Sequence, residues 1–132
     1  MFEKKERIYY EDTDAGGVVY HANYLKLMER CRSDWLDSIG FSVADLQNNH
    51  DIVFAVRKVQ MDFLAPARLF DYVTVNCDVL HIGKVKIEIS QNIYNQANLL
   101  CSATIKLATL ERTSFKLSPM PTALYNCLSK VY

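Results

Sequence analysis

The sequence predicts an α+β fold in which an antiparallel sheet of five strands wraps around one long helix. An amphipathic helical pattern covers residues 24–39, and four segments of alternating apolar and polar residues follow it between residues 51 and 111. A short aromatic segment before the helix supplies the fifth strand. A chain of 132 residues is long enough to bury a core, so we assign residues 1–132 to a single domain.

The first strand is expected at residues 5–10, which end in one β-branched and two aromatic residues. Residues 11–23 then hold three acidic residues within four positions, a glycine pair and His21. A glycine-bent loop that ends at a helix start places a carboxylate and an imidazole beside free backbone N–H groups and the positive end of the helix dipole. This arrangement suits acyl-transfer chemistry.

Each residue of this loop also has a purely structural explanation. Asp12 or Asp14 could hydrogen-bond its own loop in an Asx turn, as most loop aspartates do. Gly16-Gly17 alone signals only a turn, and His21 could be an exposed residue that flanks the helix. For each residue taken alone, the structural explanation is favoured over a catalytic role. The combination of these residues in one short loop favours a functional loop, although their spacing alone does not identify a reaction.

The long helix is predicted from apolar residues that recur every three or four positions, namely Tyr24, Met28, Cys31, Trp35 and Ile39. Leucines beside this stripe widen it, so we expect the helix to be deeply packed. Asn23 is the favoured N-cap, with His21 as a competing start, and Gly40 is the expected C-terminal stop.

A second, short helix is predicted over residues 42–49, with Ser42 as its cap and Val43 and Leu46 facing inward. The alternating pattern typical of strands with one covered face then predicts strands at 51–63, 70–81, 85–94 and 99–111. Two prolines end the sheet region, and a terminal helix is expected at 122–131.

Composition argues against several classes of protein. Fifteen basic and fifteen acidic residues give zero net charge with no basic stripe, which argues against nucleic acid as a partner and against electrostatic membrane docking. No apolar run approaches the ~18 residues of a membrane span, and the N-terminus lacks the apolar core of a signal peptide. The four cysteines are widely spaced, which favours free thiols in a reducing cytoplasm over disulfides or a metal site.

On these residues, the chain resembles the 4-hydroxybenzoyl-CoA thioesterase family, and most closely its bacterial YbgC-like acyl-CoA thioesterase branch. The matching positions are Arg7-Ile8, Thr13-Asp14, Gly17-Val18-Val19, Tyr20-His21 and Asn23-Tyr24. Residues 54–69, with their Leu-Ala-Pro-Ala-Arg turn, are similar to the second strand of the family. The resemblance covers nearly the whole chain, and it implies the hotdog fold and a homodimer that pairs again into a tetramer.

The resemblance implies an acyl-CoA thioesterase that releases free acid and coenzyme A without a cofactor. It places the catalytic carboxylate at Asp14, as a general base on water or as a nucleophile that forms a mixed anhydride. A base would benefit from burial beside residues 18–20. The backbone N–H near His21 would hold the carbonyl oxygen, and the imidazole could orient water or protonate the leaving thiolate.

Three further residues are candidates for substrate contacts. Tyr20 and Tyr24 could line the acyl site, although the helical stripe favours a core position for Tyr24. Lys84, in the turn before the fourth strand, lies near the position where relatives of the family place basic contacts to the phosphates of coenzyme A. Other basic residues considered for this role, with solvated surface charge as the alternative, are Arg57, Lys58 and Arg68.

Two other functions compete with this prediction. A hotdog dehydratase acting on hydroxyacyl carrier protein is disfavoured because its His-Phe-Pro type of motif is absent from the sequence. The main alternative is a non-catalytic scaffold that binds acyl groups or acyl carrier protein and is linked to phospholipid or envelope machinery. Both the thioesterase and the scaffold belong to lipid metabolism, and both predict a protein without a transmembrane segment.

Overall fold

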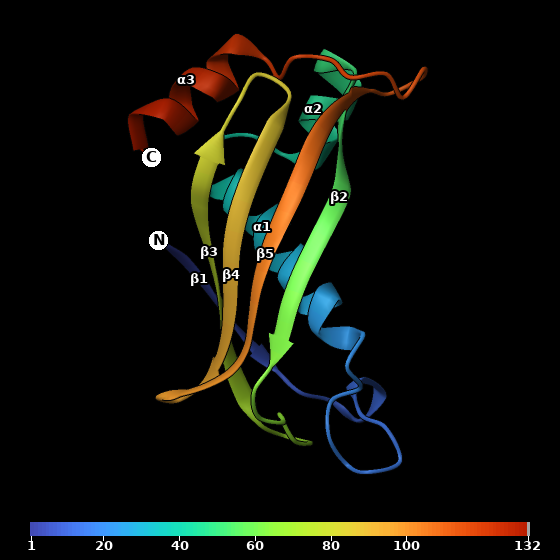
Figure 1. Ribbon diagram of the computed structural model, residues 1–132, viewed down its shortest axis with the longest axis vertical. Coiled ribbons are helices and arrows are strands. Elements are labelled where there is room, and N and C mark those ends of the chain that lie inside the picture. The colour runs from blue at the N-terminus through green and yellow to red at the C-terminus, as the bar shows by residue number, and fades with distance from the viewer. Residues whose placement is uncertain (132) are drawn as a thin grey trace.

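The computed structural model describes residues 1–131 (Figure 1). Tyr132, the last residue of the predicted domain, lies outside the described residues. The helices are α1 (Asn23–Ser38), α2 (Val43–His50) and α3 (Thr122–Val131), with a one-turn 3-10 helix at Tyr10–Asp12. The strands are β1 (Phe2–Arg7), β2 (Ile52–Phe63), β3 (Tyr72–Ile82), β4 (Lys86–Asn95) and β5 (Asn98–Glu111).

All neighbouring strands pair antiparallel, in the order β1-β3-β4-β5-β2. The long helix α1 lies across one face of this sheet (Figure 1). These features confirm the α+β class and the five-stranded hotdog arrangement. Apart from β1 and the 3-10 helix, which was not predicted, every strand and helix begins and ends within two residues of its predicted bounds. None of the helices within residues 1–131 combines the length and the apolar character that crossing a bilayer requires.

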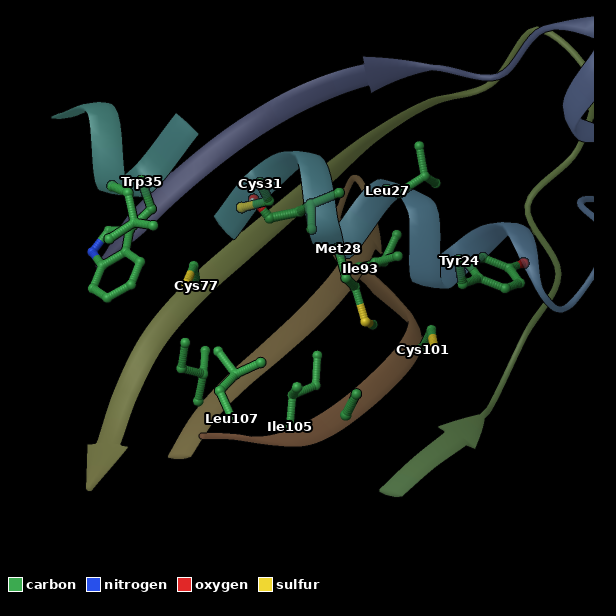
Figure 2. Packing of buried hydrophobic residues seen from close by; sticks show 14 of the residues in the cluster. Tyr24, Leu27, Met28, Cys31, Trp35, Cys77, Ile93, Cys101, Ile105 and Leu107 are labelled. Atoms are coloured by element: carbon green, nitrogen blue, oxygen red, sulfur yellow. The ribbon is translucent and has the colours of Figure 1, made fainter. Parts of the chain in front are cut away.

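The core lies between α1 and the sheet, as Figure 2 shows. The predicted helical stripe is buried from Tyr24 to Trp35, and Ile39 packs against the core as a half-buried residue. The strands contribute inward side chains such as Ile93, Ile105 and Leu107. Each large apolar side chain buried in this way contributes about 1.5–3 kcal/mol, so this layer holds the helix in place on the sheet.

The start of α1 differs from the prediction. Ala22 occupies the N-cap position and makes no side-chain cap, whereas Asn23 is the first helical residue. The Asn23 side-chain amide donates instead to the backbone carbonyl of Asp12, at 2.9 Å. The predicted N-cap is therefore wrong, because the preceding loop uses this side chain. Gly40 follows the helix with φ +89, the left-handed conformation expected of a C-terminal stop.

Strand β1 ends at Arg7, three residues before its predicted end. The cause is Asp12, whose carboxylate accepts a hydrogen bond of 2.9 Å from the Tyr9 N–H and closes the 3-10 turn. In α2, Ser42 caps as expected, because its hydroxyl accepts from the Asp45 N–H at 2.9 Å. Leu46 is buried, but Val43 is 48% exposed, so the inward position predicted for Val43 is wrong.

The two edges of the sheet are β1 and β2. Strand β2 is the longer edge, with 12 residues, and its backbone groups on one side have no neighbouring strand within residues 1–131. Large apolar residues are exposed on it, with Val59 at 37% and Phe63 at 53%. A long, apolar edge strand is a surface on which another chain can pair.

Candidate active site

The loop before α1 closes on itself through its backbone. The Asp14 N–H donates to the Val18 carbonyl at 2.9 Å, and the Gly17 N–H donates to the Asp14 carbonyl at 3.0 Å. Gly17 has φ +76, a conformation that a residue with a Cβ rarely adopts. The glycine pair therefore makes the tight turn that the sequence predicts, and Asp14 lies at its first position.

Neighbouring segments hold this loop in place. The Val19 N–H donates to the Ala67 carbonyl and the Tyr20 N–H to the Asp12 carbonyl, each at 2.9 Å. Val18 also forms an isolated bridge with Arg68. The loop thus rests on the connection between β2 and β3 on one side and on the first turn of α1 on the other.

The two aspartates of the loop have different surroundings. The half-buried Asp12 caps the 3-10 turn through its carboxylate, which is a structural role. Asp14 is exposed, and one carboxylate oxygen accepts from the Gly16 N–H at 2.8 Å, as in the Asx turn considered from the sequence. Its other oxygen has no hydrogen-bond donor within residues 1–131. Asp14 is not buried beside residues 18–20 within the single chain, so the burial that would favour a general base is absent from the protomer.

His21 follows the loop and is exposed among aromatic rings. Its ring centroid lies 4.5 Å from that of Tyr20 and 6.1 Å, edge to face, from that of Phe63. Phe63 also contacts Tyr24, at 5.8 Å between centroids. These four rings form an aromatic cluster at the start of α1. Sequence reasoning missed Phe63 as a site residue, since a strand-end aromatic gives no signal of its distant neighbours.

The start of α1 presents backbone donors next to this cluster. The Asn23 N–H donates to the Tyr20 carbonyl at 2.8 Å. Within the described part of the chain, the N–H groups of His21 and Ala22 have no hydrogen-bond acceptor. Unpaired N–H groups at the positive end of a helix are suited to receive an oxyanion.

Tyr24 belongs to the core, as its place in the helical stripe predicted. It is only 4% exposed, and its hydroxyl oxygen accepts a hydrogen bond of 3.1 Å from the Ala67 N–H. Burial is the main cause that raises the pKa of this phenol. The hydroxyl thus ties α1 to the connection that supports the loop, and a substrate contact from Tyr24 stays a prediction.

The structure does not bring Lys84 together with Asp14. Lys84 is exposed in the turn after β3, at the opposite end of the sheet from the loop (Figure 1). Strand β3, whose first residue Tyr72 pairs with Arg7 near the loop, has 11 residues and so spans about 35 Å. Within one protomer, Lys84 and the loop therefore belong to different ends of the molecule.

An apolar cavity of about 330 Å³ opens between α2, the C-terminal half of α1 and the start of β2. It is lined by core side chains, including Trp35, Leu46 and Ile89, and also by the charged residues Glu29 and Arg32. The volume falls within the range of small-molecule pockets. This cavity lies along α1 from the loop, at the end of the helix away from His21.

The thiols offer no competing nucleophile in the core. All four cysteines are free, and three of them are buried. Burial raises the pKa of the Cys31 and Cys101 thiols to about 11, which keeps them protonated near neutral pH. No group of three His, Cys, Asp or Glu side chains that could hold a metal ion occurs among the described residues.

Comparisons with known proteins agree with this architecture. A model of the thioesterase superfamily matches residues 16–102, a segment that begins two residues after Asp14. The chain is 36% identical to the acyl-CoA thioesterase YbgC of Haemophilus influenzae over 83% of this chain and 81% of that protein. It is 34% identical to the acyl-CoA thioesterase YbgC of Helicobacter pylori (strain J99), over 95% of this chain and 98% of that protein. The solved structure of a probable thioesterase from Bartonella henselae superposes with a TM-score of 0.87 at 29% sequence identity. The match covers 90% of this chain and 98% of that chain.

Proposed function

The chain belongs to the thioesterase superfamily, and from this premise we propose that it hydrolyses acyl-CoA to a free acid and coenzyme A. The observation that carries the proposal is the loop itself. An exposed carboxylate, two unpaired backbone N–H groups and an imidazole lie within residues 14–22, directly before one helix. Hydrolysis of a thioester needs these groups, because water must lose a proton while negative charge develops on the carbonyl oxygen.

In this mechanism, Asp14 acts on the attacking water or on the substrate itself. As a general base, its carboxylate takes a proton from water while the water oxygen bonds to the thioester carbon, and the carbon–sulfur bond then breaks. As a nucleophile, it bonds to that carbon, expels the thiolate and leaves a mixed anhydride for water to cleave. The free carboxylate oxygen supports both routes.

The N–H groups of His21 and Ala22 receive the carbonyl oxygen of the thioester as it becomes negative. Both precede the first helical residue, so the positive end of α1 adds to their effect. The His21 imidazole is exposed beside Tyr20 and Phe63, where it can protonate the leaving thiolate. The same rings form an apolar wall for the acyl group or the pantetheine arm.

We further infer that the working form is a homodimer joined along β2. This edge strand exposes Val56, Val59 and Phe63, and pairing of two copies would satisfy its free backbone groups. Antiparallel pairing places Phe63 of each copy near the partner's end of the strand at Ile52, which borders the apolar cavity. One copy would then supply the loop and the other the acyl pocket, and Asp14 would become buried.

The test compares two aspartate variants of the same loop. Asp14→Asn should lower kcat on acyl-CoA by ~10²-fold or more, because the amide neither takes a proton nor attacks the carbonyl. Asp12→Asn, whose amide oxygen can still accept the Tyr9 N–H bond, should keep kcat within a few-fold. Thiol release from short, medium, long and aromatic acyl-CoA substrates measures both. Full activity of Asp14→Asn would refute the assignment.

The same experiment separates the enzyme from the scaffold. A scaffold would release no thiol from any acyl group, while its binding to acyl carrier protein would persist in Asp14→Asn. For an active enzyme, a single turnover in isotopically labelled water distinguishes the two routes. Label in the Asp14 side chain would identify it as the nucleophile, whereas label only in the released acid favours the general base.

A further inference from the structure

The apolar cavity between α2, α1 and β2 contains a charge that an aliphatic acyl group does not need. Most of its lining consists of core side chains of the helix and the sheet, such as Trp35, Ile89 and Leu107. The half-buried Arg32 of α1 lines the same cavity. A hydrocarbon chain gains only from apolar contacts, so the guanidinium requires another explanation.

Buried amides fix the position of the Arg32 guanidinium. Its Nη1 atom donates a hydrogen bond of 2.9 Å to the side-chain oxygen of Gln91, which has no exposed surface. The amide nitrogen of Gln91 donates to the backbone carbonyls of Met28, at 3.0 Å, and Asn76, at 3.3 Å. Both N–H groups of this amide are thus used, and its oxygen is held toward Arg32.

This contact places the guanidinium beside the lining of the cavity. Gln91 follows Ile89 by two positions on β4, so both side chains lie on the face of the sheet that α1 covers. Ile89 itself lines the cavity. A nitrogen 2.9 Å from the Gln91 oxygen is therefore next to an apolar wall.

Most donors of this guanidinium are unused. It has five N–H groups, and within residues 1–131 its only hydrogen-bond acceptor is Gln91. Glu29 lies one helical turn earlier and also lines the cavity, but its carboxylate accepts from the Ser33 hydroxyl at 2.7 Å. In the described part of the chain, Arg32 makes no ion pair within 4 Å. A half-buried cation without a counter-charge is costly to the fold.

We propose that Arg32 binds a carboxylate at the far end of the acyl group, so that the protein acts on coenzyme A thioesters of dicarboxylic acids. The inference rests on the proposed function, which gives the cavity an acyl group to hold. Arginine binds a carboxylate through two parallel charge-assisted hydrogen bonds. A carboxylate also brings the negative charge that Arg32 lacks in the protomer, which a hydroxyl group does not.

The proposed dimer gives the acyl group a route to Arg32. In it, the thioester at the loop of one copy lies near the Ile52 end of β2 in the other copy. Ile52 and Arg32 line the same cavity, so the cavity connects the two places. Its apolar wall would hold the methylene groups, and the guanidinium would receive the charged end. A mostly apolar pocket with a few fixed polar groups is typical of sites that select one ligand.

A purely structural role for Arg32 makes a different prediction. If the bond to Gln91 only ties α1 to β4, substitution of Arg32 should lower stability and should affect all substrates alike. Discrimination between two substrates that differ only at the far end of the acyl group is therefore the property to measure.

The test uses pairs of thioesters of equal chain length, in which a terminal carboxylate replaces a methyl group. The pairs are glutaryl-CoA with pentanoyl-CoA, adipoyl-CoA with hexanoyl-CoA, and suberoyl-CoA with octanoyl-CoA. The wild type should have the higher kcat/KM for the dicarboxylic member of at least one pair. Arg32→Gln should lower that value about tenfold or more, mainly through KM, and should leave the methyl-terminated member within a few-fold.

Two variants serve as controls. Arg30→Gln removes an exposed arginine of the same helix that does not line the cavity, and it should leave the preference unchanged. Arg32→Lys keeps the charge and should retain part of the preference. A wild type without preference for the carboxylate in any pair, or an equal loss on both members in Arg32→Gln, would overturn the inference. A stronger preference for ω-hydroxyhexanoyl-CoA than for adipoyl-CoA would also overturn it.

Glu29→Gln provides a test that leaves the bond between Arg32 and Gln91 in place. Glu29 is the one carboxylate among the described residues that line the cavity. Its neutralisation removes a repulsion and should raise kcat/KM for the dicarboxylic member several-fold, with no change for its methyl-terminated partner. A lower or unchanged value would contradict the proposed site.

If the wild type hydrolyses no thioester, the proposed function fails, and calorimetry with free adipate and hexanoate decides this inference instead. Tighter binding of adipate that Arg32→Gln loses and Arg30→Gln keeps would support it. Equal binding of the two acids, or no binding of either, would overturn it.

Discussion

The buried face of α1 and the loop that precedes it are adjacent in the sequence but are held by different forces. The helix face is held by side chains, since Met28, Cys31 and Trp35 pack against the sheet with almost no exposure. The loop is held by its backbone, through hydrogen bonds that leave the Asp14 and His21 side chains exposed. Stability should therefore depend on one region and activity on the other.

The division has a physical reason. Side chains that fill a core must exclude water, whereas a carboxylate that acts on a substrate must be reachable and must keep one oxygen free of hydrogen bonds within the fold. Backbone hydrogen bonds hold most of the loop, with help from the Asp12 and Asn23 side chains, so the Asp14 and His21 side chains can stay exposed. The following substitutions test this comparison, in order of their expected effect on the free energy of unfolding.

Trp35→Ala should have the largest effect. The indole is 3% exposed and lies in the core cluster, so its removal leaves a cavity and should lower the free energy of unfolding by about 3–5 kcal/mol. Urea unfolding followed by circular dichroism measures the change. A loss below about 1 kcal/mol would contradict the assignment of this helix face to the core.

Tyr24→Phe should have an intermediate effect, because Tyr24 connects the two regions. The substitution removes only the hydroxyl oxygen and leaves the buried Ala67 N–H without its acceptor, which costs about 1–3 kcal/mol. Because Ala67 also accepts from the Val19 N–H, hydrogen exchange of the Val19 amide should accelerate. Protection equal to the wild type would show that the loop does not depend on this contact.

Asp14→Asn should have the smallest effect on stability while abolishing most of the activity. The amide oxygen can still accept the Gly16 N–H, so the free energy of unfolding should stay within about 0.5 kcal/mol of the wild type. Thermal unfolding beside the thiol-release assay measures both properties. A large loss of stability would mean that the carboxylate supports the loop and that the two regions are not separable.

Much of the fold follows from local patterns. The three-and-four spacing from Tyr24 to Trp35 specified α1, and alternation specified the strands, because burial of one face imposes these periods directly. The errors occur where a polar side chain bonds to a backbone group of another segment. The Asp12 carboxylate caps a turn, so β1 ends earlier than predicted. The Asn23 side chain donates to the Asp12 carbonyl instead of capping α1.

The candidate site was predictable only in part. Its residues before the helix are contiguous, so the turn at Gly17 and the position of Asp14 could be expected from the sequence. Phe63 comes from a distant strand and meets His21 only through the fold. Lys84 is a candidate only through the family resemblance, and it lies at the far end of the sheet from the loop.

The sequence by itself determined the elements, the loop and the family, because each depends on residues close together in the chain. Tertiary structure decided which distant residues share a cavity. Arg32 lines the apolar cavity beside Ile89 of β4, and its bond to Gln91 joins residues that are 59 positions apart. A shift of one residue moves a side chain to the other face of a sheet, so only the assembled sheet shows which strand residue meets Arg32.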